Sequence, residues 1–235
     1  MDFSSLANGF GIVWQNLDYL IWGNYPDGPI GGIVLTLFMS LIAIILSTIL
    51  GIFAGVGLAV LTGWKRTLLV MLLGFLRAIP ILMLIFWTYF LLPVLLNIDV
   101  PAIASVIMAL ALIGAAYIAH AVYAGMIAIT HDQWQAAYSL GLKPKQVIIY
   151  IILPQAIKMM MPSFVNQWIS LIKDSSLAYV VGVAEFTFLA TQVNNRSMVY
   201  PTEIFLFVIG VYFVMCWSLD FVVTWLTKTM MAKNG

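Results

Sequence analysis

Charged residues are scarce in this sequence. Only 8% of its 235 residues are Asp, Glu, Lys or Arg, whereas a soluble domain carries about 25%. Apolar residues make up 63% of the chain, and its mean hydropathy is +1.07. Water cannot solvate a surface so poor in ions, which excludes a soluble globular enzyme. The composition instead predicts one all-helical domain that crosses a membrane several times.

Residues that bind nucleic acids or metals are also few. Ten Lys/Arg against nine Asp/Glu give a net charge of +1, too small for a basic nucleic-acid footprint. One cysteine, Cys216, excludes a disulfide framework, and two histidines, His120 and His131, make a His-rich metal site improbable. We therefore expect neither a metal ion nor a cofactor in this chain. The sequence contains no GxxxxGK[ST] loop, so any nucleotide hydrolysis must occur on another polypeptide.

Intervals with few charged residues predict the membrane-spanning helices, because about 20 apolar residues cross the hydrocarbon layer. Five such intervals occur, at residues 30–61, 68–92, 101–129, 159–183 and 204–226. We expect residues 1–29 to form an outer, interfacial segment, because polar residues interrupt its apolar run and its Trp and Tyr residues favour a membrane surface. Whether residues 8–22 cross the membrane stays open. Residues 30–230 form the predicted transmembrane domain, and residues 231–235 an inner tail.

The distribution of Lys and Arg predicts the orientation, because short cytoplasmic loops are enriched in these residues. With the N-terminus outside, only Arg196 lies in an outer loop. The inner side then receives Lys65, Arg66, Lys143, Lys145, Lys158, Lys228 and Lys233. We therefore expect an N-out, C-in topology.

The longest predicted inner segment, residues 131–156, has the features of a compact docking loop. Residues 133–140 form an Ala-rich helical stretch, and Gly141 follows at a position suited to a helix C-cap. Pro144 suits the first turn of a second short helix, and the Leu153-Pro154 pair indicates the start of a third element.

Three stretches of the sequence resemble motifs of one transporter family. Residues 133–137 (QWQAA), Gly141 and residues 153–156 (LPQA) resemble the EAA loop of ABC importer permeases. Residues 75–80 (FLRAIP) resemble the F-x-R-x-x-P segment of the polar amino-acid (His/Glu/Gln/Arg/opine) importers. Residues 173–177 (KDSSL) and 182–187 (GVAEFT) resemble the K-D-[ST]-S-L…G-V-x-E-[FL] region of the same group. The resemblance covers about residues 30–230, with the motifs in the family's order.

The resemblance implies a type I ABC importer (MetI-like) transmembrane domain, and a transport subunit rather than an enzyme. Its function would be that of a permease in an ATP-driven, binding-protein-dependent importer of polar amino acids, with glutamine or glutamate/aspartate favoured. Implied partners are a second permease chain, identical or paralogous, an ABC ATPase dimer that carries ATP and magnesium on the cytoplasmic face, and an outer substrate-binding protein. The implied location is the bacterial plasma (inner) membrane, which the chain would cross several times.

The resemblance also assigns the 131–156 loop to ATPase coupling, as the helix inserted into a groove of the ATPase. The coupling residues that it implies are Gln133, Gln135, Ala136, Ala137, Leu140, Gly141, Leu142, Leu153 and Pro154. Gln135 stands where the family has a leading Glu, so a strong salt bridge from this position to the ATPase is not expected.

Polar residues within the predicted spans are candidates for a substrate pathway, because ionised groups are costly in hydrocarbon. The candidates are Arg77, His120, Lys173, Asp174, Ser175, Ser176 and Glu185. Each also has a structural interpretation: a pair for Arg77, intersubunit pairing for Lys173 and Asp174, solvation for Glu185 and packing for His120. The alternative function is an ion- or proton-gradient-driven secondary transporter that uses Arg77, Lys173, Asp174 and His120 as a relay, although no internal repeat is detected.

Overall fold

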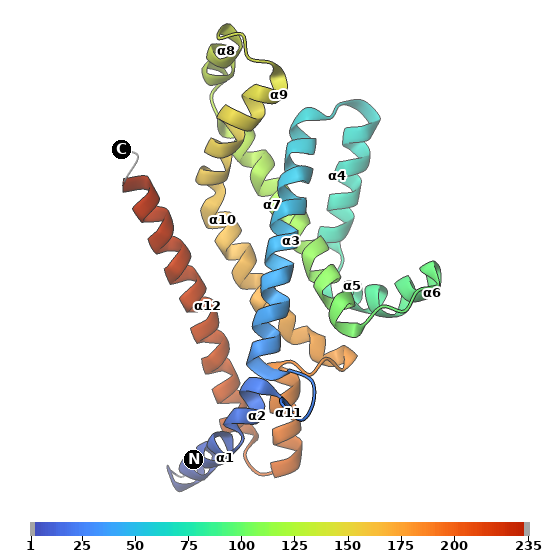
Figure 1. Cartoon of the computed structure of the whole chain (residues 1–235), viewed down its shortest axis with the longest axis vertical. Coiled ribbons are helices and arrows are strands. Elements are labelled where there is room, and N and C mark those ends of the chain that lie inside the picture. Colours follow the sequence, from blue (N-terminus) through green and yellow to red (C-terminus); the bar gives the residue numbers. More distant parts are fainter. Residues whose placement is uncertain (1–2, 233–235) are drawn as a thin grey trace. The chain divides into compact units, whose positions relative to one another are not determined.

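The computed structural model describes residues 3–232 and is helical throughout (Figure 1). The predicted inner tail, 231–235, falls mostly outside the described residues. In chain order the elements are α1 (Phe3–Gln15), α2 (Leu17–Trp22), α3 (Gly32–Val60), α4 (Gly63–Ala78), α5 (Ile81–Phe86), a π-helical turn (Trp87–Leu91), α6 (Leu92–Leu96), α7 (Ala102–Ala128), α8 (His131–Ser139), α9 (Pro144–Val147), a second π-helical turn (Ile148–Ile152), α10 (Leu153–Asp174), a 3₁₀ helix (Ser175–Val181), α11 (Phe186–Ser197) and α12 (Pro201–Ala232).

Among the described residues, four helical segments are long and apolar enough to cross a membrane, and the prediction of an all-helical multispan protein is confirmed. These segments are Gly32–Val60, Ala102–Ala128, Pro144–Val181 and Pro201–Thr227. The third begins earlier than the predicted span 159–183, because α9, the second π-helical turn and α10 continue without interruption. The wider π turn precedes Pro154, whose ring would crowd a regular α-helical turn. Helix α10 begins at Leu153, as the Leu153-Pro154 pair predicts, and it follows this widened turn without a break in the helix.

A break does interrupt the predicted span 68–92. Ile79 adopts an extended backbone conformation, with φ −80° and ψ 134°, and α4 ends at Ala78. The residue before a proline is disfavoured in the α region, so Pro80 explains the ending. Helix α5 then starts at Ile81, and the bent pair Gly63–Ala78 and Ile81–Leu96 counts as a fifth span only if its two parts cross the membrane together.

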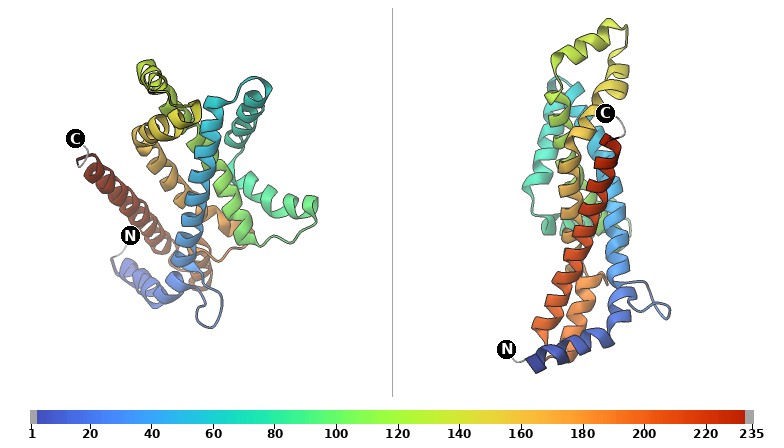
Figure 2. Two further views of the ribbon diagram at one scale, coloured as in Figure 1. Left: turned by 45° about the horizontal axis from the view of Figure 1, so that its top comes forward. Right: turned by 90° about the vertical axis from the view of Figure 1, so that its left-hand side faces the viewer.

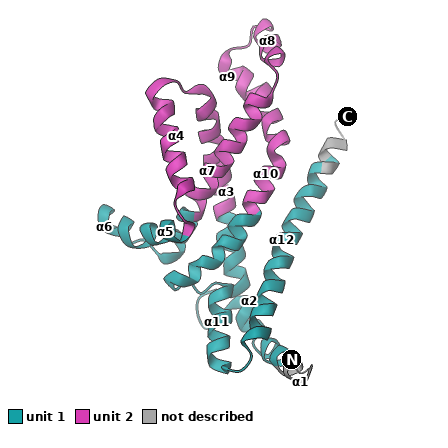
Figure 3. Cartoon of the chain, turned by 180° about the vertical axis from the view of Figure 1, so that it is seen from behind, with its two compact units in different colours: residues 1–42, 82–109, 169–235 teal, residues 43–81, 110–168 magenta. Residues whose placement is uncertain are grey.

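The described chain forms two compact units, coloured separately in Figure 3. Unit 1 comprises residues 1–42, 82–109 and 169–235, and unit 2 comprises residues 43–81 and 110–168. In unit 2, α3 and α7 approach closely at glycines. A Cβ added to Gly51 or Gly55 would lie 2.6 Å from Ile118 or Val122, so only glycine permits this helix crossing.

In unit 1, the short helices α1 and α2 pack against α11 and α12. Their shared apolar cluster includes Val13, Leu20, Phe186, Leu189 and Ile204. Helix α1 lies across the end of α12 (Figure 2). Its 13 residues reach only about 20 Å, less than the hydrocarbon thickness. This length agrees with an interfacial segment, and the position of residues 1–29 in the membrane stays a prediction.

Candidate functional site

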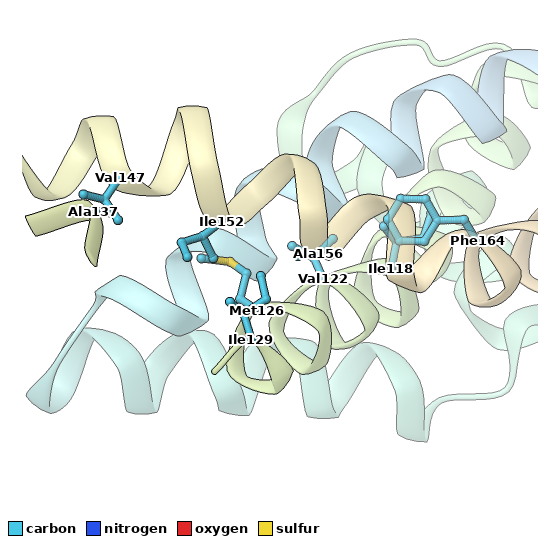
Figure 4. Close-up of a cluster of buried hydrophobic side chains, with 9 residues drawn as sticks. All are labelled: Ile118, Val122, Met126, Ile129, Ala137, Val147, Ile152, Ala156 and Phe164. Atoms are coloured by element: carbon cyan, nitrogen blue, oxygen red, sulfur yellow. The ribbon is translucent and has the colours of Figure 1, made fainter. Parts of the chain in front are cut away.

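Helix α8, within the predicted coupling loop, has one face anchored in the core of unit 2. Ala137 is 2% exposed and belongs to an apolar cluster with Val147, Ile152 and Met126. Figure 4 shows Ala137 beside Val147, which lies on α9. Leu142 and Leu153, two of the implied coupling residues, also pack against this cluster. Ala137 is fully used in this packing, whereas Leu142 and Leu153 are partly buried.

Most of the remaining surface of α8 is exposed. Gln133, Gln135, Ala136 and Leu140 are all exposed, and Leu140 retains 78% of its accessible surface. An exposed leucine next to small and amide side chains is suited to a protein contact. Of the implied coupling residues, Gly141 and Pro154 are exposed as well.

The turn after α8 follows the local rules expected from the sequence. Gly141 has φ +77°, and its N–H donates to the carbonyl of Tyr138 at 2.9 Å. Pro144 is the first residue of α9, and the N–H of Lys143 donates to Oε1 of Gln146 at 2.8 Å. The predicted C-cap at Gly141 and the predicted proline position are thus confirmed. Both features fix the direction in which the chain leaves α8.

The lysine–aspartate pair lies where α10 changes into the 3₁₀ helix. Lys173 is exposed and Asp174 is half-buried. The hydroxyl of Ser176 donates to the carbonyl of Lys173, and that of Ser175 donates to the carbonyl of Ile172, both at 2.7 Å. Four of the pathway candidates therefore lie at this one junction. The hydroxyls of the two serines already donate to backbone carbonyls of the same segment.

Arg77 and His120 both belong to unit 2, and they have different partners. The Arg77 guanidinium lies 5.1 Å from the ring centroid of Tyr117, a cation–π geometry, in the last turn of α4. The Nδ1–H of His120 donates to the carbonyl of Ala116 at 2.9 Å on the same helix. The described contacts do not bring these two candidates together, and those of His120 agree with a packing role.

Glu185 is the most completely bonded of the pathway candidates. It is fully buried and caps the N-terminus of α11, accepting hydrogen bonds from the N–H groups of Thr187 and Phe188, each at 2.8 Å. The Tyr212 hydroxyl on α12 donates to the same carboxyl at 3.2 Å, and the Thr36 hydroxyl on α3 lies 3.5 Å away. One carboxyl thus links three helices.

The surroundings of Glu185 favour two opposite protonation states. Burial raises the pKa of its carboxyl from the ordinary 4.5 to about 7, while the hydrogen bonds from Thr187, Phe188 and Tyr212 hold the pKa lower than burial alone would. The adjacent backbone is fixed as well, because the N–H of Gly32 donates to the carbonyl of Ala184 at 2.9 Å. Glu185 is therefore built to position helices in unit 1.

The sequence alone did not identify Thr36 and Tyr212 as partners of Glu185. They lie 149 and 27 residues away along the chain, respectively, and only the tertiary packing joins them. The available signal was weak, since Thr36 and Tyr212 each stand as a polar side chain within a strongly apolar stretch.

Comparison with known proteins assigns the family. Residues 47–231 match the family model described as the inner membrane component of binding-protein-dependent transport systems. The chain belongs to this family. The glutamine ABC transporter permease GlnP of Bacillus subtilis (named as probable) is 35% identical over 191 residues, which are 80% of this chain and 87% of that protein. The glutamate/aspartate import permease GltK of Escherichia coli is 32% identical over 84% of this chain and 91% of its own length. These relatives place the chain among the permeases of amino-acid ABC transporters.

Solved permease structures share the fold. An amino acid ABC transporter crystallised with histidines matches with a TM-score of 0.76 at 23% identity, over 97% of this chain and 99% of the other. The MetNI methionine transporter in an inward-facing conformation matches with a TM-score of 0.67 at 18% identity, over 81% of this chain and 92% of the other. The expected MetI-like fold is thereby confirmed.

Family membership settles several expectations. The chain is a multi-pass inner-membrane permease of a bacterial ABC importer, and a transport subunit rather than an enzyme. Permeases of this family carry no cofactor, because ATP binds the partner ATPase. A binding-protein-dependent system also requires a substrate-binding protein.

Proposed function

We propose that this permease imports glutamine or glutamate/aspartate. The broader assignment, a permease subunit of a binding-protein-dependent ABC importer of polar amino acids, rests on the family match. The narrower proposal is supported by the names of the relatives at 32–35% identity, whereas a cystine permease of Bacillus subtilis, TcyB, is 27% identical. Competition for uptake by unlabelled glutamine, glutamate, aspartate and cystine tests it. Competition by cystine alone would overturn the proposal.

Coupling to the ATPase is proposed to occur through the exposed face of α8. The observation that carries this proposal is that one short helix is anchored through the buried Ala137 while Gln135, Ala136 and Leu140 stay exposed. A helix fixed on one side transmits force applied to the other. Closure of the ATPase would then move the 131–156 loops and open the permease to the outside, and their separation would reverse the change.

Substitution of Gly141 tests this coupling. Proline cannot adopt the φ of +77° found there, so Gly141→Pro would misdirect α8 and reduce ATP-dependent uptake at least tenfold, with membrane insertion unchanged. Asparagine tolerates this conformation, so Gly141→Asn is the matched control and should retain most of the uptake. Normal uptake by the proline variant would refute the docking role.

The substrate pathway is proposed to run along a polar stripe of α10. Ser163, Asn166, Ser170 and Lys173 recur at three- and four-residue spacing, so they lie on one helical face, and none of them is buried. A polar face turned toward lipid is costly, which favours an aqueous path or a second permease chain opposite it. Lys173 would end this stripe beside the partly exposed Asp174 and Ser176, whereas Ser175 is fully buried and would not face the path. Arg77 and His120 remain candidates elsewhere along the path.

Replacement of Lys173 tests the stripe. Lys173→Met removes a cation that would meet the substrate carboxylate, and we expect the uptake KM to rise about tenfold, as for one charged hydrogen bond. Lys158→Met removes an equal charge from an exposed position of the same helix, about four turns away, and should change the KM less than twofold. Equal effects of the two variants would contradict a substrate contact at Lys173.

The composition and orientation of the complex are also part of the proposal. Two permease chains, identical or paralogous, would associate with an ABC ATPase dimer on the cytoplasmic face and an outer binding protein, with the N-terminus of each permease outside. Family membership supports ATP as the energy source over the ion-gradient alternative. Uptake by reconstituted vesicles that follows a proton gradient and ignores ATP would reverse that choice.

A further inference from the structure

A cavity of about 570 Å³ lies within unit 2, between the ends of α3 and α7, the start of α4 and one face of α8. Its volume falls within the roughly 300–1,000 Å³ typical of small-molecule sites. Leu58, Met126 and Ile129 contribute apolar walls, and Trp134 and Tyr138 contribute aromatic ones. Neither the substrate pathway nor the docking face of α8 uses this cavity.

Arg66 supplies the positive charge of the cavity. Its Nε–H donates to the carbonyl of Leu58 at 3.2 Å, and its Nη2 donates to the Tyr123 hydroxyl at 3.0 Å. A guanidinium has five N–H donors, and the described residues provide no acceptor for the other three. The cavity walls, as far as the structure describes them, contain no carboxylate. The guanidinium also lies 5.7 Å from the centroid of the Tyr123 ring. Arg66 is therefore held in place by neutral groups, and no carboxylate of the described cavity wall pairs with its charge.

The location of the cavity points to a ligand that comes from the membrane. Helices α3 and α7 are strongly apolar and end at Val60 and Ala128, next to the cavity. Val60 and Ile127 expose apolar side chains there, and Trp64 exposes 71% of its surface. Exposed tryptophan beside lysine and arginine at a helix end is typical of the headgroup region on the cytoplasmic side.

Helix α8, the proposed coupling helix, forms another wall of the cavity. His131, Trp134 and Tyr138 line it at three- and four-residue spacing, so they occupy one face of α8. Ala136 and Leu140 lie about 120–180° around the helix from them, on the face proposed to meet the ATPase, whereas Gln135 lies beside His131 at the border of the two faces. An occupant of the cavity would therefore contact α4 and α8 together and leave Ala136 and Leu140 open to the ATPase.

We propose that this cavity binds the phosphate-bearing headgroup of an anionic lipid from the leaflet next to α8. Three free guanidinium donors fit phosphate oxygens, and the apolar and aromatic walls fit the glycerol and upper acyl region. The bound lipid would brace α8 against α4 and so support transmission of force. This consequence rests on the proposed coupling role of α8, whereas the binding site itself does not.

Lipid retention by the assembled transporter tests the site. Native mass spectrometry of the complex, titrated with phosphatidylglycerol or phosphatidylcholine, should show preferential retention of one phosphatidylglycerol per permease chain. Arg66→Gln should weaken that retention about tenfold. Lys65→Gln removes the same charge from the neighbouring exposed residue, which does not line the cavity, and should weaken retention less than twofold. Equal retention in both variants would overturn the proposal.

A second variant separates loss of charge from loss of fold. Ala59 lines the cavity from an exposed position, so Ala59→Phe should fill it, weaken lipid retention several-fold and leave thermal unfolding unchanged. Normal retention by a folded Ala59→Phe variant would place the lipid elsewhere and overturn the proposal.

Two further experiments distinguish an anionic lipid from a soluble phosphate and from an acidic side chain of the ATPase. Displacement of phosphatidylglycerol by millimolar inorganic phosphate or glycerol phosphate would show a site for a soluble phosphate instead. Loss of ATPase co-purification in Arg66→Gln, with lipid retention intact, would show that the cavity receives an acidic ATPase side chain. Retention that depends on Arg66, combined with uptake that is insensitive to Gly141→Pro, would retain the lipid site and reject the coupling proposal.

Discussion

Glu185 in unit 1 and Arg66 in unit 2 are two ionisable side chains that differ in how completely their hydrogen-bonding capacity is used. The Glu185 carboxyl is fully buried and accepts hydrogen bonds from two backbone N–H groups and a tyrosine hydroxyl. The Arg66 side chain is exposed, has two neutral acceptors and borders a cavity. A buried carboxyl whose hydrogen bonds are complete holds helices together, whereas an exposed guanidinium with unused N–H donors beside a cavity is available to a ligand.

Removal of the Glu185 carboxyl is the most damaging test of this comparison. Glu185→Ala leaves the N–H groups of Thr187 and Phe188 and the Tyr212 hydroxyl without their acceptor, at about 1–3 kcal/mol for each buried group. We expect the free energy of unfolding in detergent to fall by about 4 kcal/mol or more. Asp99→Ala removes an exposed carboxylate of the same unit and should change it by less than about 0.5 kcal/mol. Similar losses in the two variants would contradict a positioning role for Glu185.

Proton uptake by Glu185 gives the next largest effect. Because the folded pKa is raised from 4.5 to about 7, the folded state binds the proton more tightly than the unfolded state. The contribution of this group to stability is present below about pH 4.5 and is lost as pH rises to about 7, by roughly 3 kcal/mol. Chemical unfolding at a series of pH values measures this slope.

Glu185→Gln is the control for the pH series, because an amide cannot titrate in this range. The variant should lose the decline between pH 4.5 and 7 and otherwise remain folded. A slope identical to that of the wild-type chain would assign the pH dependence to another group.

How far the sequence predicts this molecule depends on how local the determining interactions are. Composition and charge-free intervals predicted the helical class, and local turn rules predicted the positive φ at Gly141 and the helix start at Pro144. The motif resemblance predicted the family. These features depend on residues close together in the chain, where backbone preferences decide.

The remaining features depend on distant contacts. Its resemblance to the EAA loop predicts that Ala137 is a contact residue for the ATPase, yet packing against Val147 buries it. The partnership of Thr36 with Glu185 and the cavity beside Arg66 both require helices from separate parts of the chain to meet. Periodicity specifies which residues share a face, but it does not specify which face another helix will cover.

The finest test of the comparison uses two tyrosines with the same chemistry. The hydroxyl of Tyr212 donates to the buried Glu185, whereas that of Tyr123 accepts from the exposed Arg66. Tyr212→Phe should lower the free energy of unfolding by about 1–2 kcal/mol, because a buried acceptor loses a donor. Tyr123→Phe should lower it by less than about 0.5 kcal/mol, because water replaces the lost partner at the exposed guanidinium. Thermal unfolding of the matched pair measures the difference. Equal losses would mean that the Arg66 contact contributes as much to folding stability as the Glu185 contact. Unused N–H donors would then fail to distinguish a ligand-binding side chain from one that only holds helices together.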